Sequence, residues 1–496
     1  MNHEVVVVGG GIGGLTVAAL LAERGVDVCL VERESRVGGC VASFEKFGYS
    51  FEPGYGLYSG WQPDEIHDRV FSELPVEAPQ VHLLEPAYQV RLPDQSEIAI
   101  SGDTQQFEEG LRRNFPECVD FAVAFYRKLA DLSAVLRREL QRAPDFLSAS
   151  TPRRTYNLLR DGRIGAEIIK VARQSTFQHL GGASPRFRRF IDVQLQALAQ
   201  GTSTEVNYLL AALALSAPGE GIFGIQGAAS RLADILAHSI KRSGGTIRLN
   251  TPALRLSYDS SGTPRGVDLL SGETVIVSKA IISNLTLWDT YGKLIGLNRT
   301  PTEIRRQLSR LRSWGAYLLY LGIDEDTAAS LASDHLLVLS DWQEDQEYDP
   351  ETRQLMIAVA PSWDPRAPSG KRAVTVHFFT DVEGWFTFHK DETELEQRDQ
   401  QMLELCWKRL HAAMPELGSA IEIIDTANPR TFYDLTRRKL GMVGGFIPSG
   451  DRFWLNEPSY STSLANVFAV GDTTQPGGIA ALTRSALVLA NRLTAR

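Results

Sequence analysis

A run of four valines, residues 5–8, is followed by a glycine-rich stretch and then by a helical pattern. A continuous β-branched run of this kind is typical of a strand that is covered on both faces. Apolar residues recur at helical spacing from Leu15 to Ala22, and Gly25 is suited to end that helix. A second apolar run, residues 26–31, has the character of the next strand. The pattern therefore predicts strand, tight turn, helix and strand.

The predicted turn contains the motif G-x-G-x-x-G, formed by Gly9, Gly11 and Gly14 with Ile12 and Gly13 between them. In such a turn the first glycine permits the bend, the second lets the backbone approach a pyrophosphate, and the third lets helix and strand pack closely. The N-terminus of the following helix offers free N–H groups to an anion. We expect these residues to bind a dinucleotide; a glycine turn used only for packing is the alternative.

The residues after the second strand extend this prediction. Glu32 ends the strand, where an acid can accept hydrogen bonds from both ribose hydroxyls. The glycine pair Gly38 and Gly39 lets the chain pass close to an extended cofactor, and Arg33 is a suitable partner for phosphates. Cys40 is expected to be an inert packed side chain, with a reactive thiol near the cofactor as the alternative. The glycine loop leaves NAD and FAD both open.

A second strand, turn and helix are predicted far along the chain. Residues 466–470 have the pattern of a strand, Gly471 and Asp472 form its sharp end, and Gly478 and Ile479 begin a helix. A helix N-terminus aimed at a flavin would stabilise negative charge on the reduced ring, while Asp472 can hold a ribityl hydroxyl. The alternative is a simple turn followed by a loop. We expect one cofactor to lie between these two regions.

Three segments carry a resemblance to a known family: "VVVVGGGIGGL…VERESRVGGC", "ISN" at residues 282–284, and "NVFAVGDTTQPGG" at residues 466–478. Together they resemble the phytoene desaturase, carotenoid isomerase and retinol saturase group of flavoproteins, which shares its fold with flavin amine oxidases. The resemblance implies an FAD cofactor and places backbone near Leu254 at its adenine side. No cysteine accompanies the C-terminal glycines, so we expect the FAD to be bound non-covalently.

The same resemblance implies an FAD-dependent oxidoreductase that acts on C–C or C=C bonds of an apolar polyene or isoprenoid. Desaturation, saturation and redox-neutral cis–trans isomerisation all remain open. One departure weakens the carotenoid assignment: the family's G-G-G-x-P-G is replaced by the run from Gly477 to Leu482. A flavin amine oxidase acting on a C–N bond is the alternative, and a non-catalytic flavin-binding carrier is a third. No residue is singled out for proton transfer.

The length of 496 residues exceeds what one hydrophobic core supports, so two domains are expected. The resemblance implies an α/β fold with a Rossmann-type FAD-binding domain of the GR2 type and a discontinuous α+β substrate domain, a mixed sheet with helices. We expect the FAD-binding domain to comprise residues 1–85, 220–295 and 425–496, and the substrate-binding domain to comprise residues 86–219 and 296–424.

Alternating and apolar runs predict strands at residues 316–322 and 373–379 and an amphipathic helix at residues 391–415. A sheet floor under helices can enclose an apolar tunnel for a long substrate. The aromatic candidates for its walls are Trp314, Trp385, Phe386, Phe388, Tyr433, Phe446, Phe453 and Trp454.

Composition limits the partners and the location. A formal charge of −9 with scattered basic residues argues against nucleic acid. Four cysteines without a C-x-x-C pair argue for a reducing compartment and against a metal site. The apolar run 208–215 is too short to cross a bilayer, so it is interpreted as a buried helix, with shallow membrane contact as the alternative. We expect a cytoplasmic protein, with attachment to the inner membrane face left open.

Overall fold

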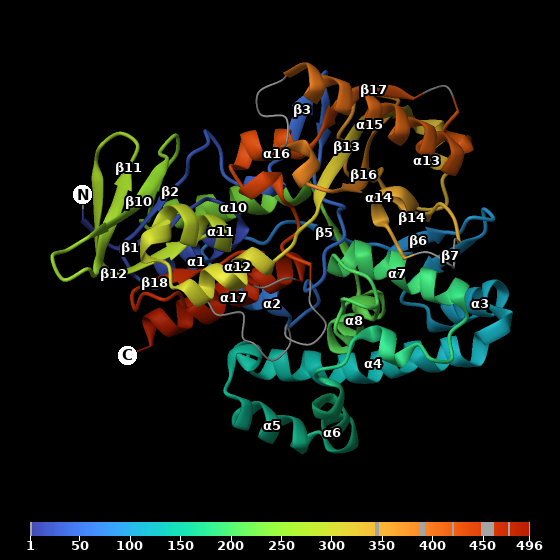
Figure 1. The fold of residues 1–496 in the computed structure, drawn as a ribbon, viewed down its shortest axis with the longest axis horizontal. Helices are drawn as coiled ribbons and strands as arrows, with labels where there is room; N and C mark the ends of the chain where they lie inside the picture. Colours follow the sequence, from blue (N-terminus) through green and yellow to red (C-terminus); the bar gives the residue numbers. More distant parts are fainter. Residues whose placement is uncertain are drawn as a thin grey trace.

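The structure is a computed structural model in which two large sheets and a group of helices are arranged side by side (Figure 1). The first sheet lies at the left of the view with both ends of the chain, and the second lies at the upper right. Helices α4, α5, α6 and α8 lie below the second sheet. The structure describes residues 2–342, 347–386, 392–418, 421–447, 461–474 and 477–495.

The first sheet has seven strands in the part of the chain that is described, in the order β10-β11-β12-β1-β2-β9, with β18 paired to β12. Strands β18, β12, β1, β2 and β9 are mutually parallel, and the hairpin β10-β11 extends the sheet antiparallel to β12. The four valines of β1 are buried, as expected for a strand covered on both faces. The strands are β1 (Asn2–Val8), β2 (Val28–Val31), β9 (Thr246–Arg248), β10 (Ala253–Tyr258), β11 (Pro264–Leu269), β12 (Thr274–Ser283) and β18 (Val467–Ala469).

Three helices cover this sheet: α1 (Ile12–Glu23), α10 (Ala228–Arg242) and α17 (Gly478–Thr494). Helix α1 packs against both α10 and α17. Its residues from Ile12 to Ala22 are all buried, because it has neighbours on several sides. The predicted strand, turn, helix and strand at the start of the chain are therefore confirmed, and so are the late strand and helix.

The second sheet also has seven strands among the described residues, in the order β17-β13-β16-β15-β14-β6-β7. The pair β14-β6 is parallel and the other pairs are antiparallel, so the sheet is mixed, as predicted. Helix α15 (Glu392–Ala413) buries Cys406 and Leu410 against it. The strands are β6 (Tyr88–Arg91), β7 (Glu97–Ile100), β13 (Gly315–Asp324), β14 (His335–Leu339), β15 (Gln354–Val359), β16 (Lys371–Thr380) and β17 (Glu422–Ala427).

In the sequence, a layer of helices lies between β7 of the second sheet and β9 of the first sheet. Its apolar helix α8, predicted at residues 208–215, packs against α4 and α7 and buries Leu209, Ala211 and Ala212. The interpretation as a buried helix is therefore confirmed. No described helix combines the length and the apolar character needed to cross a bilayer. The layer comprises α3 (Thr104–Asn114), α4 (Val119–Arg142), α5 (Thr151–Arg160), α6 (Gly162–Val171), α7 (Pro185–Ala199), α8 (Tyr208–Leu215) and α9 (Ala217–Glu220).

Shorter elements complete the described chain. They are β3 (Phe44–Lys46), β4 (Tyr49–Phe51), α2 (Ile66–Phe71), β5 (Val81–Leu83), β8 (Phe223–Ile225), α11 (Leu287–Asp289), a π-helical turn (Thr290–Gly296), α12 (Thr302–Arg310), α13 (Glu325–Ala329), α14 (Pro350–Arg353) and α16 (Pro429–Thr436). The division into two domains at the predicted boundaries stays a prediction.

Two buried histidines lie on the second sheet, His335 on β14 and His377 on β16. The ring of Tyr55 contacts both edge-on, at centroid distances of 5.6 and 5.8 Å. Burial, assisted by the nearby Arg366 cation, lowers the pKa of His335 to about 3. Burial also lowers the pKa of His377 to about 4. Both rings are therefore neutral in the folded protein over the physiological pH range.

These histidines predict a loss of stability in mild acid. The unfolded chain binds protons at its histidines near pH 6.5, whereas the folded chain binds them only near pH 3 to 4, so acidification below 6.5 favours unfolding. Each histidine is expected to remove about 2 kcal/mol from the free energy of unfolding between pH 6.5 and 5. Urea unfolding at pH 7 and pH 5 measures this loss, which should be smaller in His335→Gln. An equal loss in both proteins would refute this assignment.

Candidate functional site

The predicted glycine motif forms the turn between β1 and α1, and the turn is too crowded for side chains. A Cβ atom on Gly14 would lie 2.3 Å from the carbonyl oxygen of Gly9, so only glycine lets α1 pack this close to β1. A Cβ on Gly11 would lie 2.6 Å from Nδ2 of Asn284, and one on Gly13 would lie 2.9 Å from its Oδ1. Gly11 is the N-cap of α1 and supplies no side-chain cap, so the first N–H groups of that helix are available to a ligand.

Asn284 is a site residue that the sequence analysis did not single out. It follows β12 directly, its N–H donates to the carbonyl oxygen of Val8 at 2.8 Å, and its side chain covers the glycine loop. The segment "ISN" served only as part of a resemblance. Its place after a parallel strand was the available signal, because the carboxyl ends of neighbouring parallel strands meet at a ligand-binding crevice.

Glu32 lies beside the same loop, as predicted from its position at the end of β2. Its Oε2 accepts a hydrogen bond from the N–H of Gly10 at 2.6 Å, and its Oε1 accepts one from the N–H of Glu34 at 2.8 Å. Its carbonyl oxygen accepts from the N–H of Thr251 at 2.7 Å. Leu254, implied by the resemblance to lie near the adenine, follows on β10 with 48% of its surface exposed.

We expect Glu32→Ala to weaken FAD retention about tenfold, since it removes a charged hydrogen-bond partner and the support of the Gly10 N–H group. Fluorescence titration of the flavin-free protein with FAD measures the dissociation constant. Glu34→Ala is the matched control, because the Glu34 side chain pairs with Arg33 and not with the loop. Equal FAD affinity in Glu32→Ala and the unchanged protein would show that Glu32 does not hold the cofactor.

The glycine pair lies against the opening glycine loop, and its predicted contact with the cofactor stays a prediction. The N–H of Gly38 donates to the carbonyl oxygen of Gly10 at 2.8 Å, and Gly38 forms a bridge with Gly11. Gly38 has a φ of +113°, a backbone conformation that favours glycine. A Cβ on Gly39 would lie 3.6 Å from the Cα of Gly11. The chain therefore passes the loop closely at both glycines.

Arg33 and Cys40 have less direct relations to the loop. The guanidinium of Arg33 donates to the carbonyl oxygens of Asp434 and Leu435 at 3.0 and 2.9 Å, at the end of α16. Neither these hydrogen bonds nor the ion pair of Arg33 with Glu34 reaches the glycine loop, so its predicted phosphate contact stays a prediction. Loss of hydration raises the pKa of the Cys40 thiol, although the nearby Arg438 cation opposes this. A protonated thiol agrees with the inert side chain that the sequence predicts.

The late strand, turn and helix start, predicted at residues 466–479, lie beside the opening glycine loop. Gly471 follows β18, and its backbone nitrogen lies 3.5 Å from the position that a Cβ on Gly13 would take. Gly478 and Ile479 begin α17, which packs along α1. The predicted proximity of the two regions is therefore confirmed for the residues that the structure describes. Gln475 and Pro476, within the same stretch, lie outside them.

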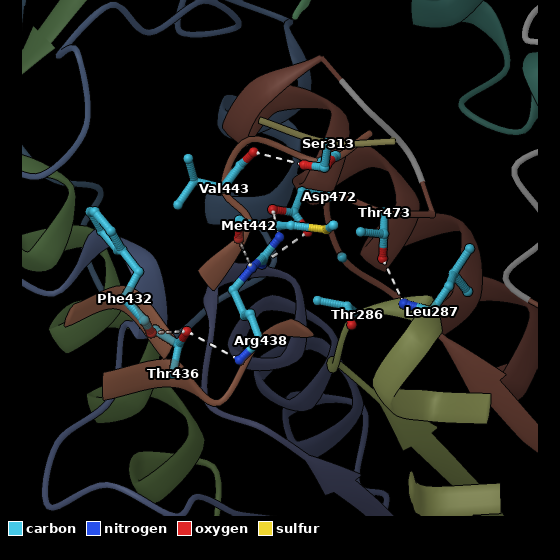
Figure 2. A network of polar contacts seen from close by, with 12 residues as sticks. Thr286, Leu287, Ser313, Phe432, Thr436, Arg438, Met442, Val443, Asp472 and Thr473 are labelled. Carbon is cyan, nitrogen blue, oxygen red and sulfur yellow. Dashed lines mark hydrogen bonds and ion pairs between the residues drawn. The ribbon is translucent and has the colours of Figure 1, made fainter. Parts of the chain in front are cut away.

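Asp472 is held in place by Arg438, a residue that the sequence analysis missed. Figure 2 shows the Arg438 side chain reaching the Asp472 carboxylate, with N–O distances of 3.2 and 2.9 Å. Nε of Arg438 donates to the carbonyl oxygen of Met442 at 2.7 Å. Although burial opposes its charge, the Asp472 carboxylate raises the pKa of Arg438. The pair places two opposite charges beside Cys40, which follows the glycine pair, and no local motif around Arg438 signals it.

A mainly aliphatic cavity of about 220 Å³ begins at the N-terminus of α17. Helix α8 contributes Leu210, Leu213 and Ala214 to its wall, and Arg137 and Arg484 are its charged residues. Among the described residues Tyr58 is its one aromatic side chain. The lining comprises Leu57, Tyr58, Ser59, Arg137, Leu140, Leu147, Leu198, Leu210, Leu213, Ala214, Ala217, Ile222, Gly477, Gly478, Ile479, Ala480, Ala481 and Arg484.

None of the aromatic candidates that the structure describes lines this cavity, so their place in a substrate tunnel stays a prediction. Trp385, Phe386 and Tyr433 pack in the core between the second sheet and α15, and Trp314 and Phe446 pack against other core clusters. Aromatic side chains bury large apolar areas, so most of them pack in a hydrophobic core. Phe388, Phe453 and Trp454 lie outside the described residues.

The two regions together have what an extended dinucleotide requires. Apart from Ile12 the loop consists of glycines, and it leads into a helix N-terminus without a side-chain cap. Glu32 lies beside the loop, and Gly471, which precedes Asp472, lies close to Gly13. The glycines, the uncapped helix N-terminus and the two carboxylates therefore fit the groups of a flavin dinucleotide.

The family model for flavin containing amine oxidoreductases matches residues 12–487. The chain belongs to this family. FAD is accordingly its cofactor, its fold is the α/β FAD-binding fold of these flavoproteins, and it is an FAD-dependent oxidoreductase. The family match thus decides between NAD and FAD, which the glycine loop left open, in favour of FAD.

Comparisons with individual proteins agree with this family assignment of the chain. It is 23% identical to the chloroplastic prolycopene isomerase of Arabidopsis thaliana, over 99% of this chain and 83% of that protein. It is also 23% identical to the all-trans-retinol 13,14-reductase of Danio rerio, over 86% of this chain and 75% of that protein. The solved structure of cyclohexylamine oxidase from Brevibacterium oxydans superposes with a TM-score of 0.59 at 16% identity, covering all of both chains. That last likeness concerns the fold alone.

Proposed function

We propose that this chain is an FAD-dependent oxidoreductase acting on C–C or C=C bonds of an apolar polyene or isoprenoid. The observation that carries the proposal is the aliphatic cavity that begins at the N-terminus of α17. Burying a hydrocarbon chain there is favourable by about 25 cal/mol per Å² of apolar surface removed from water. The related proteins named prolycopene isomerase and all-trans-retinol 13,14-reductase support the same substrate class.

We propose the following roles for the residues around the cofactor. The opening loop holds the pyrophosphate, Glu32 holds the ribose, and the backbone near Leu254 lies along the adenine. Asp472, oriented by Arg438, holds the ribityl chain, and the N-terminus of α17 lies at the ring. The residues assigned to FAD binding are Gly9, Gly11, Ile12, Gly13, Gly14, Glu32, Arg33, Gly38, Gly39, Cys40, Leu254, Gly471, Asp472, Gly478 and Ile479.

The bound flavin supplies hydride transfer to or from a carbon atom. The chain's own contribution is to position the substrate and to exclude water. Leu210 and Leu213 present an aliphatic wall that orients a chain-like molecule by packing alone. The positive end of the α17 dipole favours negative charge at its N-terminus. No side chain is assigned to proton transfer.

The cavity argues against amine oxidation. A protonated amine would meet the two cations Arg137 and Arg484 in a mainly aliphatic space, and no lysine lines the described wall. The aromatic cage expected for an amine substrate is also missing from that wall, where Tyr58 stands alone. The C–N alternative is therefore less well supported than the C–C reaction.

Anaerobic mixing of the FAD-loaded protein with retinoids, carotenoid polyenes and amines tests the proposal. We expect a polyene to bleach the oxidised flavin or to be isomerised by the reduced protein, while amines leave the spectrum unchanged. Leu210→Trp should fill the cavity and slow the polyene reaction at least tenfold, with the FAD content of the protein unchanged. Bleaching by an amine alone would overturn the proposal.

The two sheets support the proposed division into an FAD-binding domain (residues 1–85, 220–295 and 425–496) and a substrate-binding domain (residues 86–219 and 296–424). The first sheet takes its strands from the first group of segments, and the second takes nearly all of its strands from the other. One boundary, at residue 425, divides β17.

We also propose a cytoplasmic location, supported by the four free cysteines. Attachment to the inner membrane face is the alternative. Helix α8, the candidate for such contact, directs Leu209 and Ala212 into the core and Leu210 into the cavity.

A further inference from the structure

Two arginines stand at one end of the aliphatic cavity. Arg137 extends from α4 and Arg484 from α17, and both line the cavity together with a smaller hollow of about 50 Å³. The smaller hollow adds Arg69 and the acids Asp64 and Glu65 to its lining. The two guanidinium groups therefore mark the junction between an aliphatic chamber and a polar one.

The positive charge at this junction is only partly balanced. Arg137 donates from Nε to Oγ of Ser133 at 3.1 Å and from Nη2 to the carbonyl oxygen of Leu213 at 3.2 Å. Its Nη1 is 3.8 Å from Oε1 of Glu65, which is beyond hydrogen-bond range. The other carboxylate oxygen of Glu65 accepts from the N–H of Gln62 at 3.1 Å. Glu220 and Glu65 thus attract the Arg137 cation electrostatically, but Glu65 lies 3.8 Å from its guanidinium and makes no hydrogen bond to it.

Within the described part of the chain Arg484 makes no close hydrogen bond or ion pair, and Glu65 is the carboxylate that acts on it electrostatically. Burial, with Arg137 beside it, lowers the pKa of Arg484 to about 10. The neighbouring His67 is buried and its pKa is lowered to about 3, so it adds no charge at neutral pH. Arg484 is half-buried, and a half-buried guanidinium without a close counter-ion favours an oxyanion such as a carboxylate or a phosphate, which accepts from its fork of N–H donors.

Building on the proposed function, we propose that the cavity takes an isoprenoid or polyene that carries a terminal oxyanion, a carboxylate or a phosphate, bound by Arg137 and Arg484. The hydrocarbon lies along Leu210, Leu213 and Leu140, and the anionic head meets the two guanidinium groups. Arg484 is six residues beyond Gly478 on α17, which is about 9 Å along the helix axis. The head group therefore fixes how far along the chain the bond at the flavin lies.

The test compares matched pairs of ligands that differ only in the head group. All-trans-retinoic acid and all-trans-retinol form one pair, and farnesyl phosphate and farnesol form the other, which separates a carboxylate from a phosphate. Binding to the FAD-loaded protein is followed at neutral pH by quenching of tryptophan fluorescence. We expect at least one anion to bind tenfold or more tightly than its alcohol.

Arg484→Gln and Arg137→Gln should each weaken binding of the anion about tenfold and change binding of the alcohol less than twofold. Unchanged alcohol binding also shows that the variant is folded. Arg138→Gln is the matched control, because Arg138 neighbours Arg137 on α4 but is 48% exposed and pairs with Asp161 at 3.1 Å. It should change neither affinity.

The outcomes separate this inference from the proposed function. Equal affinity for acid and alcohol, or equal losses of both in Arg484→Gln, would overturn the anionic head group while leaving the polyene oxidoreductase intact. No binding of any of the four ligands would overturn the proposed function and this inference with it.

Discussion

Gly14→Val is expected to abolish FAD binding, with a dissociation constant raised about a hundredfold or more. The first side-chain atom would lie 2.3 Å from the carbonyl oxygen of Gly9 and 2.9 Å from Cβ of Asn284. Neither contact can be relieved by a flexible side chain, because the first partner is backbone and the second is the stiff base of a side chain. Overpacking of this kind costs about 1–3 kcal/mol, and here the turn that presents the helix N–H groups must move.

The measurement is the FAD content of the purified protein, followed by titration of the flavin-free form. Gly181→Ala is the matched control, because a Cβ there meets no atom within 4 Å. It should retain full flavin content. If Gly14→Val purifies with a full complement of FAD at unchanged affinity, the loop does not hold the cofactor as described.

Arg438→Met has the second large expected effect. It leaves the Asp472 carboxylate without the guanidinium that lies 2.9 Å away and removes the donor to the carbonyl oxygen of Met442. Breaking a buried ion pair typically costs 3–5 kcal/mol, and the partial exposure of Asp472 reduces this to about 3 kcal/mol of unfolding free energy. FAD affinity should fall as well, because Asp472 loses its orientation.

A double-mutant cycle isolates this pair. Asp472→Asn in the Arg438→Met background should cost much less than it does alone, because the charge it removes no longer has a partner. Arg437→Met is the matched control, since Arg437 is the neighbouring residue, is 47% exposed and pairs with Asp434 at 3.1 Å. Its effect should stay within about 0.5 kcal/mol. Strict additivity of the two changes at Arg438 and Asp472 would show that they do not act together.

Local pattern was sufficient to predict the elements of the proposed dinucleotide site. The valine run, the glycine turn and the helix from Ile12 are determined by burial and by backbone crowding within a short segment, so their signals lie in adjacent residues. The late strand and α17 were predicted for the same reason. Their proximity to the opening loop followed from the need of one extended cofactor for both.

Contacts that depend on the packing of distant segments were not predicted. Arg33 donates to carbonyl oxygens at the end of α16, and its expected phosphate contact stays a prediction. Arg438, which has no motif around it, reaches Asp472 across the fold. Asn284 reaches the loop because β12 lies beside β1 in the sheet, and sheet order is not written in any one segment.

The walls of the cavity could not be predicted from composition. Aromatic residues are apolar enough to line a tunnel, but a hydrophobic core buries their large surface equally well. Trp385 lies in such a core. Part of the wall comes from α8, which also packs against α4 and α7. An apolar helix without polar faces gives no indication of which side a ligand contacts.

The central claim is that one flavin dinucleotide joins the opening glycine loop to the N-terminus of α17. Its most direct test is to purify the unchanged protein, release the cofactor by heat and identify and quantify it by chromatography. We predict one FAD for each chain, lost from Gly14→Val and reduced in Asp472→Ala, with a shifted flavin spectrum in the latter. A colourless protein that does not bind added FAD would contradict the account.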